Sequence, residues 1–309
     1  LAANTTADQN TAIGCFALMA NTTGSDNTGV GHQALKSTTT GSDNTAVGRA
    51  ALNDNTTGAR NTAVGDQALA NNTTAADNVA IGYYSLHQNT TGAQNVAVGR
   101  EALEKNNADY NTAIGYQALE ENTTGTQNSA LGRLALTANT TASENTAVGY
   151  LALTANTTGG YNSAFGAEAL DGNTTGTENT AVGYQSLSAS MTGSSNTGVG
   201  NYALTAVTTG DSNTALGRNA GDGITTGSQN VAIGRHALSS NSAANDNVAI
   251  GFYALKVNTT GADNTGIGCS ALTANTTGAY NVAVGHRALL ANTTGGSNIA
   301  IGVQALSTQ

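Results

Sequence analysis

The sequence contains no proline and no tryptophan, and only 9% of its residues are charged and 4% aromatic. An average globular domain has about a quarter charged residues and roughly 5% proline. Glycine, in contrast, is abundant, with 39 residues among 309. Because this composition departs so far from that of a globular domain, internal repeats have to be sought before the length is divided into domains.

Basic side chains are few and scattered singly. The chain has 10 Lys and Arg against 19 Asp and Glu, a formal net charge of −9. Binding to nucleic acid phosphates needs clustered Lys and Arg, so no nucleic-acid partner is expected. No apolar run approaches the roughly 18 to 20 residues that span a bilayer, and the first residues do not resemble a signal peptide. We therefore expect no membrane segment here and place any secretion signal outside this stretch.

The chain also has few metal-binding side chains. Cys15 and Cys269 occupy the same position of repeats that are fifteen copies apart, which in a straight stack of strands corresponds to ~70 Å, far beyond the ~7 Å limit for a disulfide. They are interpreted as two surface substitutions, with a link between chains as the alternative. The 4 histidines lie in widely separated copies, and zinc needs three or four converging ligands. No metal site is expected.

One short motif, Asn-Thr-Ala-Val-Gly with small variations, recurs throughout the chain. A typical copy runs from Asn145 to Tyr161, and its residues are numbered here as positions one to seventeen. The spacing is 17 residues except for 16 between Asn95 and Asn111. Position one is occupied by Asn10, Asn27, Asn44, Asn61, Asn78, Asn95, Asn111, Asn128, Asn145, Asn162, Asn179, Asn196, Asn213, Asn230, Asn247, Asn264, Asn281 and Asn298. We predict one continuous array over residues 1–309, with partial repeats at 1–9 and 298–309 and one structural rung per copy.

The residue types of each copy favour strands. Position two is Thr, Ser, Val or Ile and position four is Val, Ile, Leu or Phe, which is β-branched chemistry with a period of two. Gly at position five, from Gly14 to Gly302, predicts a corner with positive φ or a close backbone approach. A second short strand is expected around positions eight and nine. The fold class predicted is all-β, a β-solenoid (β-roll) of about 18 stacked rungs with two short parallel strands each, about 85 Å long.

Several positions are expected to form the interior. Leu occupies position nine in all copies but one, where Gly221 stands, and we expect this row and position four to form two apolar rows. In that copy, Ile224 is expected to refill part of the space. Positions three and eight are always small, which indicates either a very thin solenoid or a second chain against that face. The Asn residues at position one should stack as a hydrogen-bonded ladder, with a row of metal or ligand sites as the alternative.

Positions twelve to fourteen usually read Asn-Thr-Thr, a formal N-glycosylation signal. The acceptors are Asn4, Asn21, Asn55, Asn72, Asn89, Asn122, Asn139, Asn156, Asn173, Asn258, Asn275 and Asn292. The alternative is that these side chains bond the backbone of a turn without any sugar. The shorter copy, which begins at Asn95, lacks only this tract, so the tract is predicted to be a loop that tolerates deletion.

No pattern typical of catalysis stands out. There is no nucleophile paired with a base, no phosphate-binding loop and no recurring pair of carboxylates, so we expect no enzyme, no catalytic residue and no cofactor. Acidic residues before the motif, such as Asp26, Asp77 and Glu144, are interpreted as surface charge, with calcium binding between rungs as the alternative. The paired threonines suggest an ice-binding face only weakly, because adjacent strand residues point to opposite faces.

The run from Asn179 to Leu187 resembles the repeats of bacterial and phage tail-fibre-domain proteins, and Asn78 to Gly82 resembles the head repeats of trimeric autotransporter adhesins. The resemblance covers essentially the whole chain. It implies a β-roll, often trimeric, on a cell or virion surface. We therefore expect a structural extracellular fibre or filament segment that associates with itself, with or without attached sugars. The alternative is an adhesin or tail-fibre module that binds a surface ligand, which exposed aromatics clustered on one face would favour.

Overall fold

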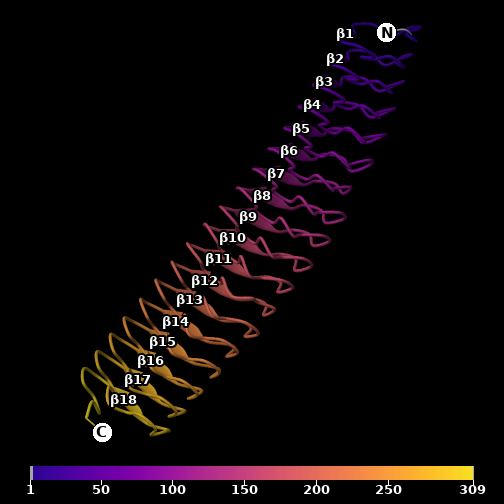
Figure 1. The fold of residues 1–309 in the computed structure, drawn as a ribbon. Coiled ribbons are helices and arrows are strands. Elements are labelled where there is room, and N and C mark those ends of the chain that lie inside the picture. Colours follow the sequence, from indigo (N-terminus) through magenta and orange to yellow (C-terminus); the bar gives the residue numbers. More distant parts are fainter. Residues whose placement is uncertain (1–2, 309) are drawn as a thin grey trace. The chain divides into compact units, whose positions relative to one another are not determined.

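The computed structural model describes residues 3–308, which fold into short β-strands joined by turns, with no helix among them (Figure 1). The chain divides into two compact units, Leu1–Leu151 and Ala152–Gln309. The strands of the first unit are β1 (Thr11–Ile13), β2 (Thr28–Val30), β3 (Thr45–Val47), β4 (Thr62–Val64), β5 (Val79–Ile81), β6 (Val96–Val98), β7 (Thr112–Ile114), β8 (Ser129–Leu131) and β9 (Thr146–Val148). Those of the second are β10 (Ser163–Phe165), β11 (Thr180–Val182), β12 (Thr197–Val199), β13 (Thr214–Leu216), β14 (Val231–Ile233), β15 (Val248–Ile250), β16 (Thr265–Ile267), β17 (Val282–Val284) and β18 (Ile299–Ile301).

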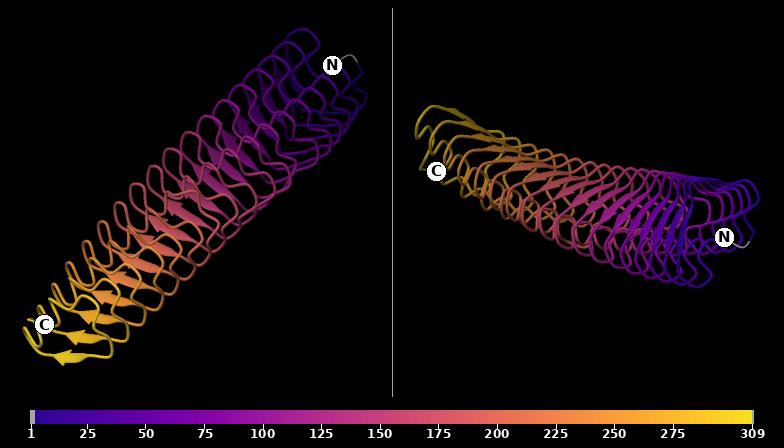
Figure 2. Two further views of the ribbon diagram at one scale, coloured as in Figure 1. Left: turned by 60° about the horizontal axis from the view of Figure 1, so that its bottom comes forward. Right: turned by 90° about the horizontal axis from the view of Figure 1, so that it is seen from above.

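Within each unit, consecutive strands pair in parallel and in the register of the repeat. Thr28 of β2 lies opposite Thr45 of β3, and Val30 lies opposite Val47. The same positions pair from β1 to β9 and from β10 to β18 (Figure 2). Each copy of the repeat therefore forms one rung, and the predicted all-β solenoid is confirmed.

The prediction of a second strand in each rung is wrong. Positions six to eleven form turns, because the residues at positions seven and nine have left-handed backbone angles, as in Gln33 (φ 63°) and Leu35 (φ 51°). A parallel strand needs φ near about −120°. The segment still bonds from rung to rung: the Leu35 N–H donates to Ala51 O at 3.0 Å and the Gln33 N–H donates to Cys15 O at 2.9 Å. It thus continues the hydrogen-bonded wall without extended geometry.

The strand presents its small residue to the interior and its β-branched residues to the outside. Ala46 at position three is fully buried, whereas Val47 at position four is 37% exposed. The expectation that position four forms an interior row is therefore wrong. The interior partner of Leu at position nine is the small residue at position three: a Cβ added to Gly29 would lie 3.5 Å from Cγ of Leu18. The solenoid is thin, and its two walls meet through Ala and Leu.

Leu at position nine is buried in every complete copy that carries it, as predicted, and the copy with Gly221 is compensated. A Cβ added to Gly221 would lie 2.9 Å from Cδ2 of Leu204 and 3.1 Å from Cδ1 of Ile224. Ile224 is fully buried, so the prediction that it refills this space is confirmed. In the copy that begins at Asn179, Ser190 at position twelve is exposed and the following residue, Met191, is buried instead.

The short copy keeps its connection to the neighbouring rung through side chains. Asn107 Oδ1 accepts hydrogen bonds from the backbone N–H groups of Thr90 (3.0 Å) and Thr91 (2.9 Å). Asp109 Oδ1 accepts one from the Ala93 N–H at 2.7 Å. Asn and Asp readily make such bonds to nearby backbone. These two side chains therefore supply acceptors where the shortened loop has one peptide group fewer, which accounts for the deletion that the sequence tolerates.

Candidate functional surfaces

The Asn residues at position one form the predicted ladder inside the solenoid. Asn44 Nδ2 donates to Asn27 Oδ1 at 3.1 Å, to Ser42 O at 3.1 Å and to Gly58 O at 2.9 Å. Its Oδ1 accepts from the backbone N–H of Asn61 at 3.0 Å and from Asn61 Nδ2 at 3.1 Å. The same pattern recurs in the second unit. Because each amide oxygen already accepts hydrogen bonds, the ladder is structural, and the alternative of a row of metal or ligand sites has no oxygen to offer.

A second ladder runs through position twelve. Asn55 Nδ2 donates to Gly58 O at 3.0 Å, and Asn72 Nδ2 donates to Asn55 Oδ1 at 2.8 Å and to Ala75 O at 3.1 Å. The Asn side chains of the Asn-Thr-Thr tract therefore bond the backbone of the turn, which is the alternative to glycosylation that the sequence left open. Of the 12 formal glycosylation acceptors, all but the exposed Asn4 are buried.

This burial bears directly on glycosylation. An N-linked sugar attaches to the side-chain amide nitrogen, which in these rungs is enclosed and donates a hydrogen bond to the carbonyl of the residue three positions further along. Among these 12 sites, modification of the folded chain is thus favoured only at Asn4, and at the others it would have to precede folding. Asn71, the acceptor of an overlapping signal with Thr73, is half-buried. The second threonine of the tract, such as Thr57, is exposed and offers a hydroxyl for O-linked sugars. Glycosylation stays a prediction.

Charged side chains pair with the same position of the adjacent rung. Arg60 Nε and Nη2 donate to the two carboxylate oxygens of Asp77 at 2.6 and 2.9 Å, and Arg49 pairs with Asp66 at 3.0 Å. Hydrogen bonding from Arg60 lowers the pKa of Asp77. Asp77 is one of the acidic residues before the motif, and it is engaged here by an arginine. Exposed ion pairs of this kind contribute little to stability. Their main effect is to place opposite charges next to each other in adjacent rungs.

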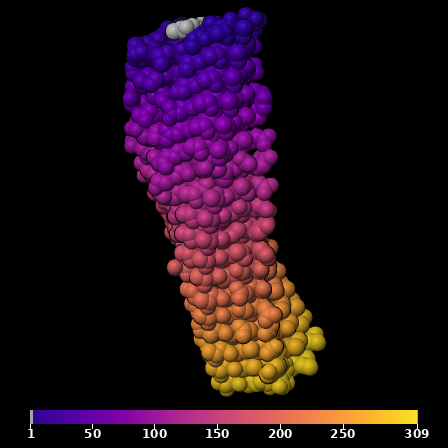
Figure 3. Space-filling model, turned by 90° about the vertical axis from the view of Figure 1, so that its right-hand side faces the viewer, coloured from indigo at the N-terminus to yellow at the C-terminus, as the bar shows by residue number. Residues whose placement is uncertain are grey.

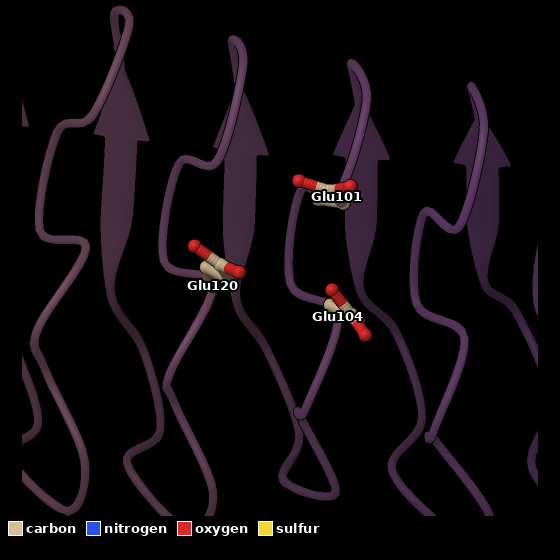
Figure 4. A group of neighbouring side chains, drawn as sticks. All are labelled: Glu101, Glu104 and Glu120. Atoms are coloured by element: carbon tan, nitrogen blue, oxygen red, sulfur yellow. The ribbon is translucent and has the colours of Figure 1, made fainter.

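Three carboxylates meet on β6 and β7 rungs, an arrangement that the sequence analysis missed. One oxygen each of Glu101, Glu104 and Glu120 lies within 4.8 Å of the others, and all three side chains are half-buried (Figure 4). Gln117 Nε2 donates to Glu101 Oε2 at 2.9 Å. Burial, followed by the neighbouring carboxylates, raises the pKa of Glu104 and of Glu120. Among residues 3–308, these are the three acidic side chains whose carboxylate oxygens lie close enough together to bind one cation.

The place of each glutamate within its repeat predicts this cluster, although no motif along the chain does. Glu101 lies at position seven, Glu104 at position ten, and Glu120 at position ten of the next copy. Residues at one position of adjacent copies stack about 4.8 Å apart. Comparing neighbouring copies position by position would have brought these carboxylates together.

We expect Glu104→Gln to raise the melting temperature at pH 7 by about 1–2 °C, because like charges in contact cost a few tenths of a kcal/mol. The folded-state pKa is raised, so the wild-type chain loses stability as the pH rises through that pKa and regains it on acidification. The gain from the substitution should therefore shrink as the pH falls toward about 4.3, the ordinary Glu value. Thermal unfolding followed by circular dichroism at several pH values, with Glu144→Gln as control, measures this. An equal gain at every pH would contradict it.

A row of tyrosine and arginine side chains follows position six over five consecutive rungs of the first unit. Tyr83, Arg100, Tyr116, Arg133 and Tyr150 alternate along it. The three tyrosines are 45%, 36% and 42% exposed. Cζ of Arg100 lies 5.5 Å from the ring centroid of Tyr83 and 5.8 Å from that of Tyr116. Cζ of Arg133 lies 5.8 Å from the Tyr116 centroid and 5.6 Å from the Tyr150 centroid. These residues are called the Tyr–Arg row below.

The outward side chains of the strands form an uncharged face. Positions two and four carry no charged residue in any copy, and position four is exposed or half-buried in every strand. Consecutive rungs stack in direct contact within each unit (Figure 3), and the parallel register places position four of one strand beside position four of the next. The side chains at positions two and four are called the outer sheet face below. The free thiols of Cys15 and Cys269 are both exposed, in keeping with surface substitutions.

Comparisons with known proteins supply no family for this chain: no protein-family model and no curated protein matches it. The resemblance to tail-fibre and autotransporter repeats therefore stays an expectation. Within residues 3–308 no helix is long and apolar enough to cross a bilayer. The features that bear on function are the Asn ladders, the outer sheet face and the Tyr–Arg row.

Proposed function

We propose that this chain is a structural segment of an extracellular or virion-surface fibre, built from stacked rungs and without catalytic activity of its own. The observation that carries the proposal is the buried Asn ladder at position one, represented by Asn44, which joins each rung to its neighbours. The ladder at position twelve, represented by Asn72, adds to it in the copies that carry Asn there. Stability in such arrays comes from nearest-neighbour stacking. Loops between rungs are short, so proteases find few extended segments to cleave.

The outer sheet face supports self-association as part of this role. Charge is excluded from it in all copies, although other outward positions vary freely and carry charge. With about 4.8 Å per rung and about 10 Å of strand width, nine rungs offer roughly 430 Å² per unit. The face of each unit, taken by itself, has the size of a small interface, which buries less than about 600 Å² per partner. A second copy of this chain is the occupant that we propose, packed side by side through β-branched side chains.

Introducing charge on this face should separate the copies. The substitutions Val47→Lys, Val64→Lys and Ile81→Lys in one chain place three cations where apolar side chains would meet, each worth about 1–3 kcal/mol of interface energy. We expect the wild-type mass in solution, measured by light scattering or sedimentation, to be a multiple of 30.6 kDa. The triple variant should shift to a single-chain mass while its circular dichroism spectrum is retained.

A matched control carries the same three charges on the loop side of the rungs, as Thr40→Lys, Thr57→Lys and Thr74→Lys. These threonines are exposed, and the control should keep the wild-type mass. A single-chain mass for the wild type at all concentrations would contradict association through this face. Equal dissociation of both variants would show that added charge, and not the outer sheet face, separates the copies.

The adhesive alternative has one specific observation in its favour, the Tyr–Arg row. Exposed aromatics gathered on one face favour ligand binding, and Tyr83, Tyr116 and Tyr150 are exposed at the same position of rungs in one unit. A fibre that only holds distance has no need of such a row.

A further inference from the structure

The Tyr–Arg row holds its guanidinium groups in fixed places. Arg133 lies between the rings of Tyr116 and Tyr150, at 5.8 and 5.6 Å from their centroids. A cation over an aromatic face is attracted by the ring quadrupole, and a ring on either side restricts the rotamers of the long side chain. The guanidinium is thereby ordered before any ligand arrives, which lowers the entropy cost of binding.

Arg133 has no acidic partner among residues 3–308, since none of the ion pairs found there includes it. Its side chain is exposed to solvent. Arg100 differs, because its Nε and Nη2 both donate to Glu101 Oε1, at 3.0 and 2.9 Å. One cation of the row is therefore free to bind an anion, and the second offers its remaining N–H groups.

The spacing of the row limits the class of ligand. Arg100 and Arg133 are two rungs apart, about 9.6 Å, with a tyrosine hydroxyl at the rung between them. A nucleic acid strand presents a phosphate about every 3.4 Å and is bound by clustered cations. Two arginines at twice the rung spacing do not match that density. They match an extended chain of sugar rings in which every second ring carries an acidic group, because two pyranose rings span a comparable length.

We propose that the Tyr–Arg row binds a linear acidic polysaccharide that lies along the stack, with one carboxylate or sulfate held by Arg133 and the next one by Arg100. The hydroxyl groups of Tyr83, Tyr116 and Tyr150 meet the sugar hydroxyls between the acidic groups. The formal charge of the whole chain is −9, so attraction is confined to this row and the affinity falls with added salt. This inference gives a ligand class to the adhesive alternative and does not depend on the structural role.

The test uses the full chain and hyaluronan oligosaccharides, which carry one carboxylate per disaccharide, with isothermal titration calorimetry at low salt. Arg133→Gln should weaken binding about tenfold or more, which corresponds to one charge-assisted hydrogen-bonded contact. The matched control is Arg218→Gln: Arg218 is also exposed at position six, but no ring stacks on it among the described residues. It should bind within about twofold of the wild type, because less than 0.5 kcal/mol is at stake.

A further pair of variants tests the role of the rings. Tyr116→Leu with Tyr150→Leu keeps Arg133 and its charge but removes both flanking rings, and this double variant should lose about as much affinity as Arg133→Gln. Neutral dextran should give no heat. The proposal is overturned if hyaluronan fails to bind, if dextran or single-stranded DNA binds as well, or if the two arginine variants lose affinity equally. Mass and circular dichroism of every variant report the fold and the oligomer separately, so failure here leaves the structural proposal standing.

Discussion

Replacing Asn44 with Ala should destabilise the solenoid by about 3 kcal/mol or more, although the change removes only one uncharged side chain. Five hydrogen bonds converge on its amide, three donated and two accepted. The substitution leaves the buried backbone N–H of Asn61 without its acceptor, which costs about 1–3 kcal/mol. The Gly58 carbonyl keeps only its hydrogen bond from Asn55, and each of the other lost bonds adds about 0.5–1.5 kcal/mol. The alanine also leaves space that the thin interior has no side chain to fill.

Asn71→Ala is the matched control, because Asn71 is only half-buried at position eleven and makes no side-chain bond within the described residues. Its effect should stay within about 0.5 kcal/mol. Urea unfolding followed by circular dichroism measures both, since the chain has no tryptophan to report by fluorescence. If Asn44→Ala lowers the free energy of unfolding no more than Asn71→Ala does, backbone stacking alone provides the stability. The Asn ladder would then not support a structural role.

The repeat revealed the rungs, but it did not reveal which way their side chains point. Alternation along Thr45, Ala46 and Val47 fits two orientations equally, and hydrophobicity favours Val inward. Packing decides otherwise, because Leu at position nine fills the interior and leaves room only for Ala opposite. The size of Leu at position nine therefore decides which face of the strand points inward. The alternation of residues within the strand itself gives no information about that Leu.

The absence of a second strand was equally hidden. Leu35 and Gln33 adopt positive φ, which costs an ordinary residue about 1–2 kcal/mol. Because Leu and Gln disfavour this conformation, the residue types at these positions do not predict the turn. The hydrogen bonds from rung to rung and the burial of Leu offset that cost in every copy. The Glu101 cluster was hidden for a different reason: it depends on which residues share a position in adjacent copies, and becomes visible only when the copies are compared in order.

The predicted glycine corner is the feature most sensitive to a single added methyl group. Gly115 follows β7 with φ 142°, and a Cβ there would lie 2.4 Å from the carbonyl oxygen of Gly132 in the next rung and 2.6 Å from its carbonyl carbon. Both atoms are backbone, held by the parallel pairing of β7 with β8. The methyl group can be accommodated only if the two rungs separate, which breaks their hydrogen bonds.

Gly115→Ala should therefore cost about 4 kcal/mol or more, combining backbone strain of about 1–3 kcal/mol with the clash. Gly302→Ala separates the two contributions, because Gly302 has φ 126° and its added Cβ would meet nothing within 4 Å. This control should show the strain alone. Hydrogen exchange then locates the damage: protection should fall in β7 and β8 and persist in β2 and β3, as expected where each rung contacts only its neighbours. Equal costs for the two alanines would mean that φ, and not the approach of the next rung, requires glycine at this corner.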